Sequence, residues 1–342
     1  MATRQVTIKD VAKQLNTSVG SVSKALTGKP GISDETRKKI IDTAKEMGYT
    51  ANRSAQCLAR KPINIAIVYP YAWEQYFNDI ITGIREALEE LRDYNVIGKF
   101  FQFSDIYSDL ELYRICDDLV REQIDAVILC PASVISCESC LLKLHSHHIP
   151  VFLIGNDFKS PGQTGCVRVN AYMSGQLASE ILCFMTPPES NFVIFLGDNN
   201  ILEHREKVQG FCDKLFNHHY LLKTFETHDE PEIASVLTKK ALYEIPNIQG
   251  FYIATGNSLA ICNVLREEKR SQEIKVIATD LLEPMIPLVK DGTINAVIYQ
   301  YPKEQGRQAI MQCYHCLVEH SHLKSEISVS YTHLTLPTTS RV

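Results

Sequence analysis

Hydrophobic residues in the first fifty positions recur with the spacing of three short amphipathic helices. In the first, over residues 8–15, apolar side chains stand at i, i+3, i+4 and i+7, which places them on one helix face. The polar run 16–18 supplies turn and N-cap residues before a second helix at 19–26. A third helix begins at the cap 33–35 and ends at Gly48. The predicted inward positions are Ile8, Val11, Ala12, Leu15, Val22, Ala25, Leu26, Ile40, Ile41, Ala44 and Met47.

The first two helices form a pair that suits DNA reading. The outward residues of the second helix are small or basic, as fits a helix whose N-terminal half enters a major groove. These residues are Val19, Gly20, Ser21 and Lys24. Because any small helical domain contains such pairs, the pattern alone leaves a purely structural interpretation open.

From residue 63 onward, short continuous apolar runs alternate with helical stretches, which is typical of parallel sheets covered on both faces. Seven runs favour two such sheets. The predicted strands are 64–70, 126–131, 151–155, 191–197, 250–255, 275–280 and 295–300. Ligands bind beyond the carboxyl ends of strands in open α/β sheets, so the polar and aromatic residues that follow them are candidates for a site.

The charge of the chain is unevenly divided. Residues 1–61 hold 12 Lys and Arg against 5 Asp and Glu, whereas the remainder holds 23 against 35. Contacts of Lys and Arg with phosphate supply most non-specific affinity for nucleic acid, so the basic head favours the DNA-binding interpretation. Between the two parts, residues 51–62 are polar and basic and are interpreted as a linker, although they carry a short helical pattern that would need a partner to order it.

Composition also bears on location and metals. The first ten residues, MATRQVTIKD, lack the apolar core of a secretory signal, and no apolar run is long enough to span a membrane, so we expect a cytoplasmic protein. The eleven cysteines are then expected to be free thiols. Two C-x-x-C pairs, Cys137/Cys140 and Cys313/Cys316, lie in helical-looking stretches without a second ligand pair at zinc spacing. We expect neither a metal nor a cofactor.

Over nearly its full length the chain resembles the LacI-type family of bacterial transcriptional regulators. The family's headpiece pattern is matched by TIKDVA, by the S-x-x-[TS]-V-S-[RK]-x-L segment that starts at Ser18, by SDETRKKI and by Gly48-Tyr49. The resemblance implies that two copies of the headpiece read half-sites of a near-palindrome. The predicted DNA contacts of the headpiece are Thr7, Ser18, Val19, Gly20, Ser21, Ser23 and Lys24.

The linker resembles the family's hinge helix N-x-x-A-x-x-L. The matching residues are Asn52, Ala55 and Leu58, and Ala59 is added to the predicted DNA contacts. The resemblance implies that two hinge helices pair in a dimer and press Leu58 into the minor groove, which kinks the operator. Ala51 departs from the pattern, since the family usually has proline there.

The remainder resembles the family's regulatory core, which is similar to periplasmic sugar-binding proteins with two lobes that close on a ligand. In the motif R-x-x-G-F, Lys207 stands in the arginine position, and Asn257 replaces an expected aspartate. Gln300-Tyr301-Pro302 with Gly306 matches Q-x-P-x-x-x-G. Carboxylate, amide and cation beside aromatic rings suit a polyhydroxylated ligand, and a sugar is the first expectation. The predicted effector contacts are Tyr71, Trp73, Phe77, Asp157, Arg205, Lys207, Asn257, Asp280 and Gln300.

The end of the chain departs from every pattern above. The letters VSYTHLTLPTT at 329–339 resemble the translation of a transposon-type sequencing adapter. We therefore expect residues 329–342 to be a non-native tail outside the fold. The family's last strand falls near 326–329, and the natural protein is expected to continue a little further.

The sequence thus predicts an α + α/β protein with a helix-turn-helix headpiece at 1–50, a hinge helix at 51–62 and a two-lobed core at 63–328. The expected lobes are about 63–168 with 299–328, and about 169–298. The predicted function is a homodimeric regulator, a repressor by first expectation, whose affinity for double-stranded operator DNA is controlled by a small molecule. A solute-binding protein of a transport system is the alternative, against which the basic head and the missing leader argue. An enzyme is not favoured, because neither a nucleophile elbow nor a phosphate loop is present.

Overall fold

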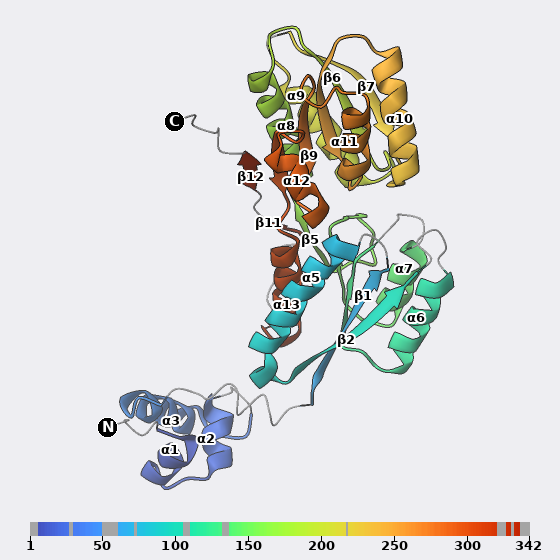
Figure 1. The fold of residues 1–342 in the computed structure, drawn as a ribbon. Coiled ribbons are helices and arrows are strands. Elements are labelled where there is room, and N and C mark those ends of the chain that lie inside the picture. The colour runs from blue at the N-terminus through green and yellow to red at the C-terminus, as the bar shows by residue number, and fades with distance from the viewer. Residues whose placement is uncertain are drawn as a thin grey trace. The chain divides into compact units, whose positions relative to one another are not determined.

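The computed structural model describes residues 6–26, 30–49, 61–71, 74–104, 110–131, 137–216, 218–319, 326–329 and 332–335. The chain divides into a small unit that contains the headpiece and a large unit that contains the core (Figure 1). In the described part of the chain, no helix combines the length and apolar character that crossing a membrane requires.

The headpiece consists of the three predicted helices, α1 (Ile8–Gln14), α2 (Val19–Leu26) and α3 (Asp34–Glu46). Thr7 and Asp10 form a capping box at the start of α1, because the Thr7 backbone N–H donates to the Asp10 carboxylate and the Asp10 N–H donates to the Thr7 hydroxyl. Ser33 caps α3 by accepting from the Thr36 N–H at 3.3 Å. The buried core of the headpiece comprises Val11, Ala12, Val22, Ala25, Ile40 and Ala44. The sequence-based helix predictions are therefore confirmed.

The first lobe of the core is built on an all-parallel sheet with the order β11-β5-β4-β3-β1-β2. Its strands are β1 (Ile63–Pro70), β2 (Val96–Phe103), β3 (Ala126–Leu129), β4 (Val151–Ile154), β5 (Gly165–Val169) and β11 (Glu326–Val329). Its helices are α5 (Glu74–Glu90), α6 (Leu110–Arg121), α7 (Glu138–Ser146) and α13 (Pro302–Glu319), with a 3-10 turn at Arg92–Tyr94.

The second lobe repeats this arrangement with the order β12-β10-β9-β8-β6-β7, in which only β12 runs antiparallel to its neighbour. Its strands are β6 (Asn191–Leu196), β7 (Tyr220–Glu226), β8 (Ile248–Ala254), β9 (Lys275–Thr279), β10 (Ala296–Tyr299) and β12 (Thr332–Thr335). Its helices are α8 (Ala171–Met185), α9 (Leu202–Lys214), α10 (Pro231–Glu244), α11 (Ser258–Glu267) and α12 (Ile286–Lys290), with a 3-10 turn at Glu283–Met285. The predicted fold class is confirmed for the headpiece and core, whereas the predicted hinge helix lies outside the described residues.

Each lobe contains a pair of helices in backbone contact. A Cβ atom added at Gly210 on α9 would lie 1.9 Å from the Tyr172 carbonyl oxygen on α8. In the first lobe, a Cβ added at Gly306 on α13 would lie 2.1 Å from the Ile80 carbonyl oxygen on α5. Both glycines belong to the motifs quoted above, so their role in the fold is to let two helices approach without side chains between them.

Two findings about the core were not expected from the sequence. Residues Thr332–Thr335, which lie within the predicted non-native tail, pair as strand β12 with β10. The likeness of 329–339 to an adapter translation concerns its origin and stays a prediction.

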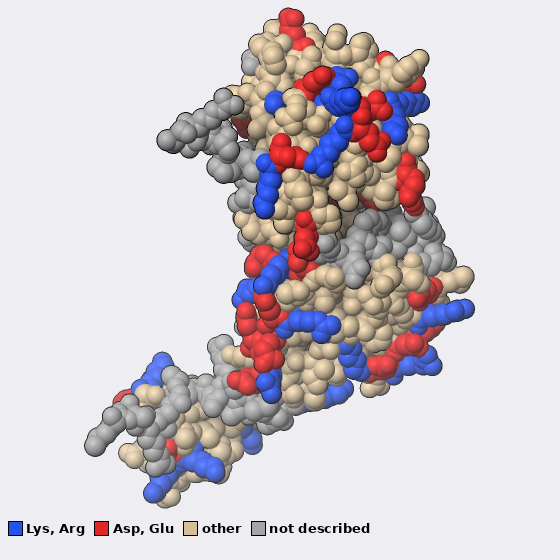
Figure 2. Space-filling model, in the orientation of Figure 1, with Lys and Arg blue, Asp and Glu red and all other residues tan. Residues whose placement is uncertain are grey.

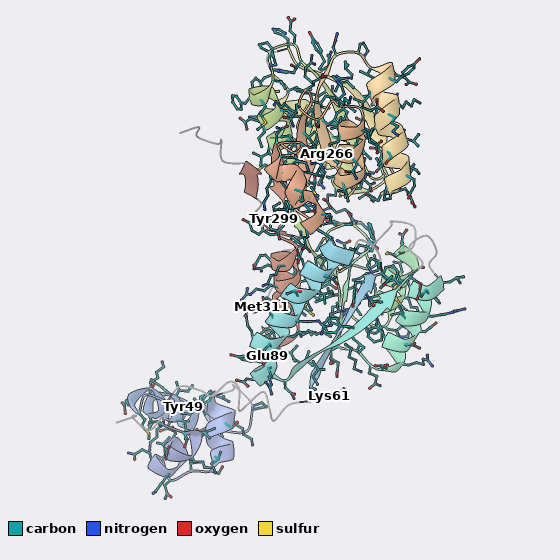
Figure 3. The ribbon with its side chains drawn as sticks, in the orientation of Figure 1. Tyr49, Lys61, Glu89, Arg266, Tyr299 and Met311 are labelled. Carbon is teal, nitrogen blue, oxygen red and sulfur yellow. A yellow bond between two sulfur atoms is a disulfide. The ribbon has the colours of Figure 1, made fainter. Side chains whose placement is uncertain are left out.

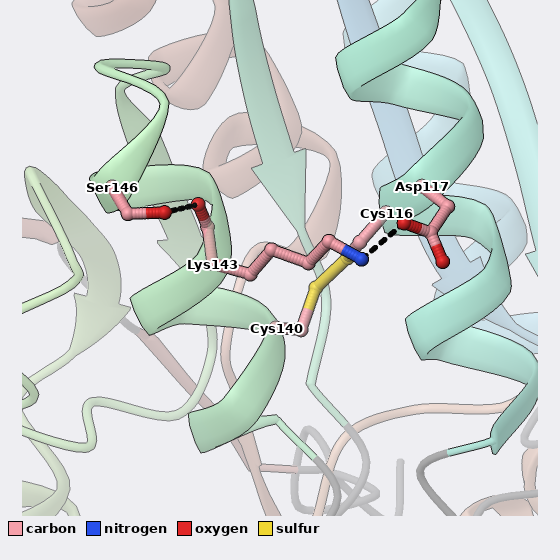
Figure 4. The surroundings of a disulfide bond; sticks show 5 residues. All are labelled: Cys116, Asp117, Cys140, Lys143 and Ser146. Atoms are coloured by element: carbon pink, nitrogen blue, oxygen red, sulfur yellow. Dashed lines mark hydrogen bonds and ion pairs between the residues drawn. A yellow bond between two sulfur atoms is a disulfide. The ribbon is translucent and has the colours of Figure 1, made fainter.

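The second finding concerns the cysteines, which were all expected to be free thiols. Cys116 on α6 and Cys140 on α7 form a disulfide, since the packing of these helices brings their Cα atoms to 6.2 Å (Figure 4). Lys143 on α7 donates to Asp117 on the neighbouring helix α6 (Figure 4). Cys313 and Cys316 are thiols on α13. Among the residues that the structure describes, no group of three or more His, Cys, Asp or Glu side chains could hold a metal ion.

Candidate functional site

A cavity of about 380 Å³ lies where the carboxyl ends of strands from both sheets meet. Strands β4, β8 and β9 end at this cavity, and Gln300 reaches it directly after Tyr299, the last residue of β10 (Figure 3). Helix α5 contributes Tyr76 and Phe77, and helix α9 contributes three ionisable side chains. The lining residues with polar side chains are Tyr76, Asn156, Glu203, His204, Lys207, Asp229, Thr255, Thr279, Asp280 and Gln300.

Lys207 and Glu203 form a buried ion pair one turn apart on α9. The Lys207 Nζ lies 2.6 Å from the Glu203 Oε1, and the two side chains are 3% and 13% exposed. Burial acts to lower the pKa of Lys207, but the Glu203 carboxylate outweighs it and the pKa is raised. Burial acts to raise the pKa of Glu203, and the Lys207 ammonium outweighs it and lowers this pKa. Both groups are therefore charged at neutral pH, and each neutralises the other.

Asp280 is held at the end of β9 in the left-handed region, with a φ of 60°. Its carboxylate accepts from the Gln300 backbone N–H at 3.2 Å and from the Gln300 Nε2 at 2.6 Å. Burial raises the pKa of Asp280 to about 6, although Gln300 and Lys207 both favour the charged form. Asp280 is thus a carboxylate whose negative charge is incompletely compensated within the protein.

The other side of the cavity holds His204, Asp229 and Thr255. Burial lowers the pKa of His204, and the nearby Lys207 charge lowers it further, so this imidazole is neutral at pH 7. The His204 Nδ1 accepts from the Asp198 backbone N–H at 2.9 Å. The Thr255 hydroxyl donates to the Asp229 carboxylate.

Four of the predicted effector residues line the cavity: Phe77, Lys207, Asp280 and Gln300. Trp73 lies outside the described residues. Tyr71 is 69% exposed and does not belong to the lining.

Three further predicted residues hold local structure instead of lining the cavity. Asp157 accepts from the Lys159 backbone N–H and from the Gln163 side chain, which fixes the loop after β4. Arg205 donates to the carbonyls of Asn199 and Asn200 at the start of α9. Asn257 is buried and donates to the Thr227 hydroxyl at 3.1 Å, and it borders a separate groove beside α11.

Sequence reasoning did not select Tyr76, Glu203, His204, Asp229 or Thr255. Thr255 is the last residue of a predicted strand, as Asp280 is, and could have been found by the same rule. Glu203 stands four residues before Lys207, which is the spacing of a helical ion pair. Asp229 follows β7, a strand that the sequence pattern did not reveal, so no signal placed it at the site.

The raised pKa of Asp280 predicts how the stability of the protein depends on pH. The pKa of Asp280 in the folded protein, about 6, lies above its value in the unfolded chain. Stability is therefore lost as the pH rises from the unfolded pKa to the folded pKa, and the full cost of the charged carboxylate is present above pH 6. We expect Asp280→Asn to raise the free energy of unfolding of the unliganded protein by about 2–3 kcal/mol at pH 8. The gain should vanish below about pH 4, where Asp280 is protonated in both states. Denaturant titrations across this pH range measure it.

Asp157→Asn is the matched control with the opposite sign. Burial acts to raise the pKa of Asp157, but the hydrogen bonds from Lys159 and Gln163 outweigh it, so the pKa is lowered. We expect Asp157→Asn to destabilise the protein at pH 8, with a loss that shrinks as the pH falls toward the acid range. Two variants with the same sign at pH 8 would contradict the assignment of these charges.

The headpiece presents the surface predicted to contact DNA. Val19 is 41% exposed, and Gly20 and Lys24 are exposed beside it on α2. The Ser18 hydroxyl accepts from the Ser21 N–H at 3.0 Å and so stabilises the first turn of α2. Figure 2 shows basic side chains on the visible face of the headpiece.

Hydrogen bonds hold the helices of the headpiece in place. Arg37 on α3 donates to the Lys24 carbonyl at 3.0 Å and to the Ala25 carbonyl at 3.3 Å, which ties the C-terminal end of α2 to α3. Thr7 uses its hydroxyl in the capping box of α1. Asn52, Ala55, Leu58 and Ala59 lie outside the described residues.

Comparison with known proteins gives two family matches. Residues 7–52 match the model of bacterial regulatory proteins of the lacI family, and residues 65–319 match the model of the periplasmic binding protein domain. The probable HTH-type transcriptional repressor ExuR of Bacillus subtilis is 28% identical over 64% of this chain and 62% of its own length. Catabolite control protein A of Priestia megaterium is 26% identical over 60% of each chain. The chain therefore spans about three fifths of the length of these relatives.

Solved structures share the fold of the core. A solute-binding protein of an ABC transporter from Burkholderia graminis, solved with D-arabinose, has a TM-score of 0.73 at 19% identity over 81% of this chain and 96% of its own. A putative LacI transcriptional regulator from Bacteroides fragilis has a TM-score of 0.71 at 22% identity over 80% and 97%. Neither the relatives nor these structures are enzymes by name. The chain belongs to the family of the periplasmic binding protein domain, and it carries ahead of that domain, at residues 7–52, a lacI-family domain of bacterial regulatory proteins.

Proposed function

We propose that this protein is a transcriptional regulator, acting as a repressor, whose affinity for double-stranded operator DNA is set by a small molecule in the core cavity. One observation carries the proposal. The same chain holds a helix α2 that is exposed on one face and packed on the other, and a ligand-sized cavity lined by polar groups from two sheets. The protein acts in the cytoplasm, where its DNA target lies.

The headpiece reads DNA with the N-terminal half of α2. Val19, Gly20 and Lys24 face base edges, while Ser18, Ser21 and Ser23 contact phosphates. Since Gly20 offers no side-chain hydrogen bond, the base preference at its position comes from shape and from its neighbours. Two copies of the chain bind as a homodimer to half-sites of a near-palindrome, with the segment 51–62 forming paired hinge helices.

The effector acts by changing the angle between the lobes. Both lobes contribute groups to the cavity, so a ligand that contacts both favours one relative orientation over others. Arg168 on β5 and Glu206 on α9 form a two-pronged ion pair that joins the lobes near this site. The first expectation for the ligand is a sugar or a related polyhydroxylated molecule, because the lining offers amides, hydroxyls and carboxylates around Tyr76 and Phe77.

A gel-shift titration on DNA upstream of the gene tests this function. The wild-type chain is expected to bind a discrete site as a dimer, and Leu58→Ala is expected to weaken operator affinity at least tenfold through loss of its apolar wedge. The same variant should keep its affinity for any ligand of the cavity within about twofold. Equal losses for DNA and ligand would reject the hinge assignment. A chain that binds sugars but no DNA would indicate the solute-binding alternative.

A further inference from the structure

We propose that the effector carries a protonated amine, as an amino sugar or a similar amine-bearing polyhydroxylated molecule does. The inference rests on the proposed function, since it names the ligand class of the same cavity. It follows from which charges in the lining are already neutralised and which are not.

The positive charge in the cavity lining is already paired with a carboxylate. Lys207 is the one Lys or Arg among the described lining residues, and its ammonium lies 2.6 Å from Glu203. His204 is neutral, because its ring is buried beside Lys207. A ligand carboxylate would compete with Glu203 for the Lys207 ammonium and would add a negative charge to a lining that already holds Glu203, Asp229 and Asp280.

The negative charges of the cavity are available. Asp280 accepts hydrogen bonds from the amide groups of Gln300, and Asp229 accepts one from the Thr255 hydroxyl. These donors are neutral, so they satisfy oxygen atoms without cancelling charge. The Lys207 ammonium also favours the charged form of Asp280, but it is already paired with Glu203. The lining therefore presents two carboxylates toward a ligand.

An ammonium group satisfies this site better than a hydroxyl or a carboxylate does. It brings three donors and one positive charge to Asp280, whose negative charge is otherwise costly to hold in a buried position. A hydroxyl leaves that charge uncompensated, and a carboxylate adds to it. The expected order of affinity is thus amine, then neutral, then acid, for ligands of the same skeleton.

Probes that share a sugar skeleton and carry an amine, no charge or a carboxylate test this order. We would measure the Kd of the full chain by calorimetry, at about pH 7, for D-glucosamine, D-glucose and D-glucuronate, and for the corresponding galactose series. The fragments ethanolamine, ethylene glycol and glycolate, used at high concentration, probe the charge preference without a particular ring. At least one amine should bind tenfold or more tightly than its neutral counterpart. An acid or a neutral member that binds best in its series, or no amine that binds, would overturn the proposal.

Two variants connect the preference to named groups. Asp280→Asn should reduce the ratio of neutral to amine Kd to about one, and Glu203→Gln should improve the affinity for the acid by freeing Lys207. The exposed Glu244→Gln on α10 is the control and should leave the ratio unchanged. An amine preference that persists in Asp280→Asn would also overturn the proposal. DNA binding measured on the same samples separates the two hypotheses: a chain that binds its operator without an amine preference keeps the proposed function and loses this inference.

Discussion

Lys207→Met should lower the free energy of unfolding by about 3–5 kcal/mol, the largest effect expected from any single side chain of the cavity. The reason is that methionine replaces the volume of lysine but leaves Glu203, whose side chain is 13% exposed, as an uncompensated buried charge. Urea titration at neutral pH measures the loss.

The double variant Lys207→Met with Glu203→Gln separates charge from packing. Since neither residue is then charged, its stability should lie within about 1 kcal/mol of wild type. Arg92→Met, which breaks an exposed pair with Glu89, should cost less than about 1 kcal/mol. A double variant as unstable as the single one would show that Lys207 acts through packing and not through its charge.

Gly210→Ala should destabilise the protein by about 3 kcal/mol or more, although alanine is the better helix former. The added Cβ would lie 1.9 Å from the Tyr172 carbonyl oxygen, and this atom belongs to the backbone of α8 and cannot turn aside. Relief requires the two helices to separate, which opens the core behind Phe211. Thermal and urea unfolding both measure the change.

Gly20→Ala is the control for helix propensity. It lies on α2, and a Cβ there would meet only the Ser18 hydroxyl at 3.6 Å. This substitution should stabilise the headpiece by about 0.5–1 kcal/mol. If Gly210→Ala also stabilised the protein, the close crossing of α8 and α9 would be contradicted.

The sequence revealed the buried strands because their apolar runs are continuous. All seven predicted strands are present, as β1, β3, β4, β6, β8, β9 and β10. β2 and β7 escaped prediction because they are edge strands in which most residues are exposed or only partly buried, so they lack a continuous apolar run. β5 is fully buried but contains Arg168, whose charge is neutralised by Glu206 from a distant helix. The sequence of the strand alone cannot show that a carboxylate on a distant helix neutralises Arg168.

The candidate site was predictable where it depends on strand ends and not where it depends on neighbours in space. Asp280 and Gln300 were found because they directly follow buried strands. Asn257 was chosen from a motif position and Arg205 because it lies close to the motif residue Lys207, but their side chains bond to nearby loop groups. Lys207 was expected to offer its charge to the ligand, whereas the fold pairs it with Glu203. That pairing is what changes the expected ligand class.

The central claim is that the cavity and the headpiece are coupled, and operator affinity with and without a bound ligand tests it most directly. We would titrate the full chain with its upstream DNA in the absence of ligand and with the tightest probe of the charge series at saturation. We expect the operator Kd to change at least tenfold, with an equal change in ligand Kd when operator is present. An operator Kd that saturating ligand leaves unchanged would contradict it.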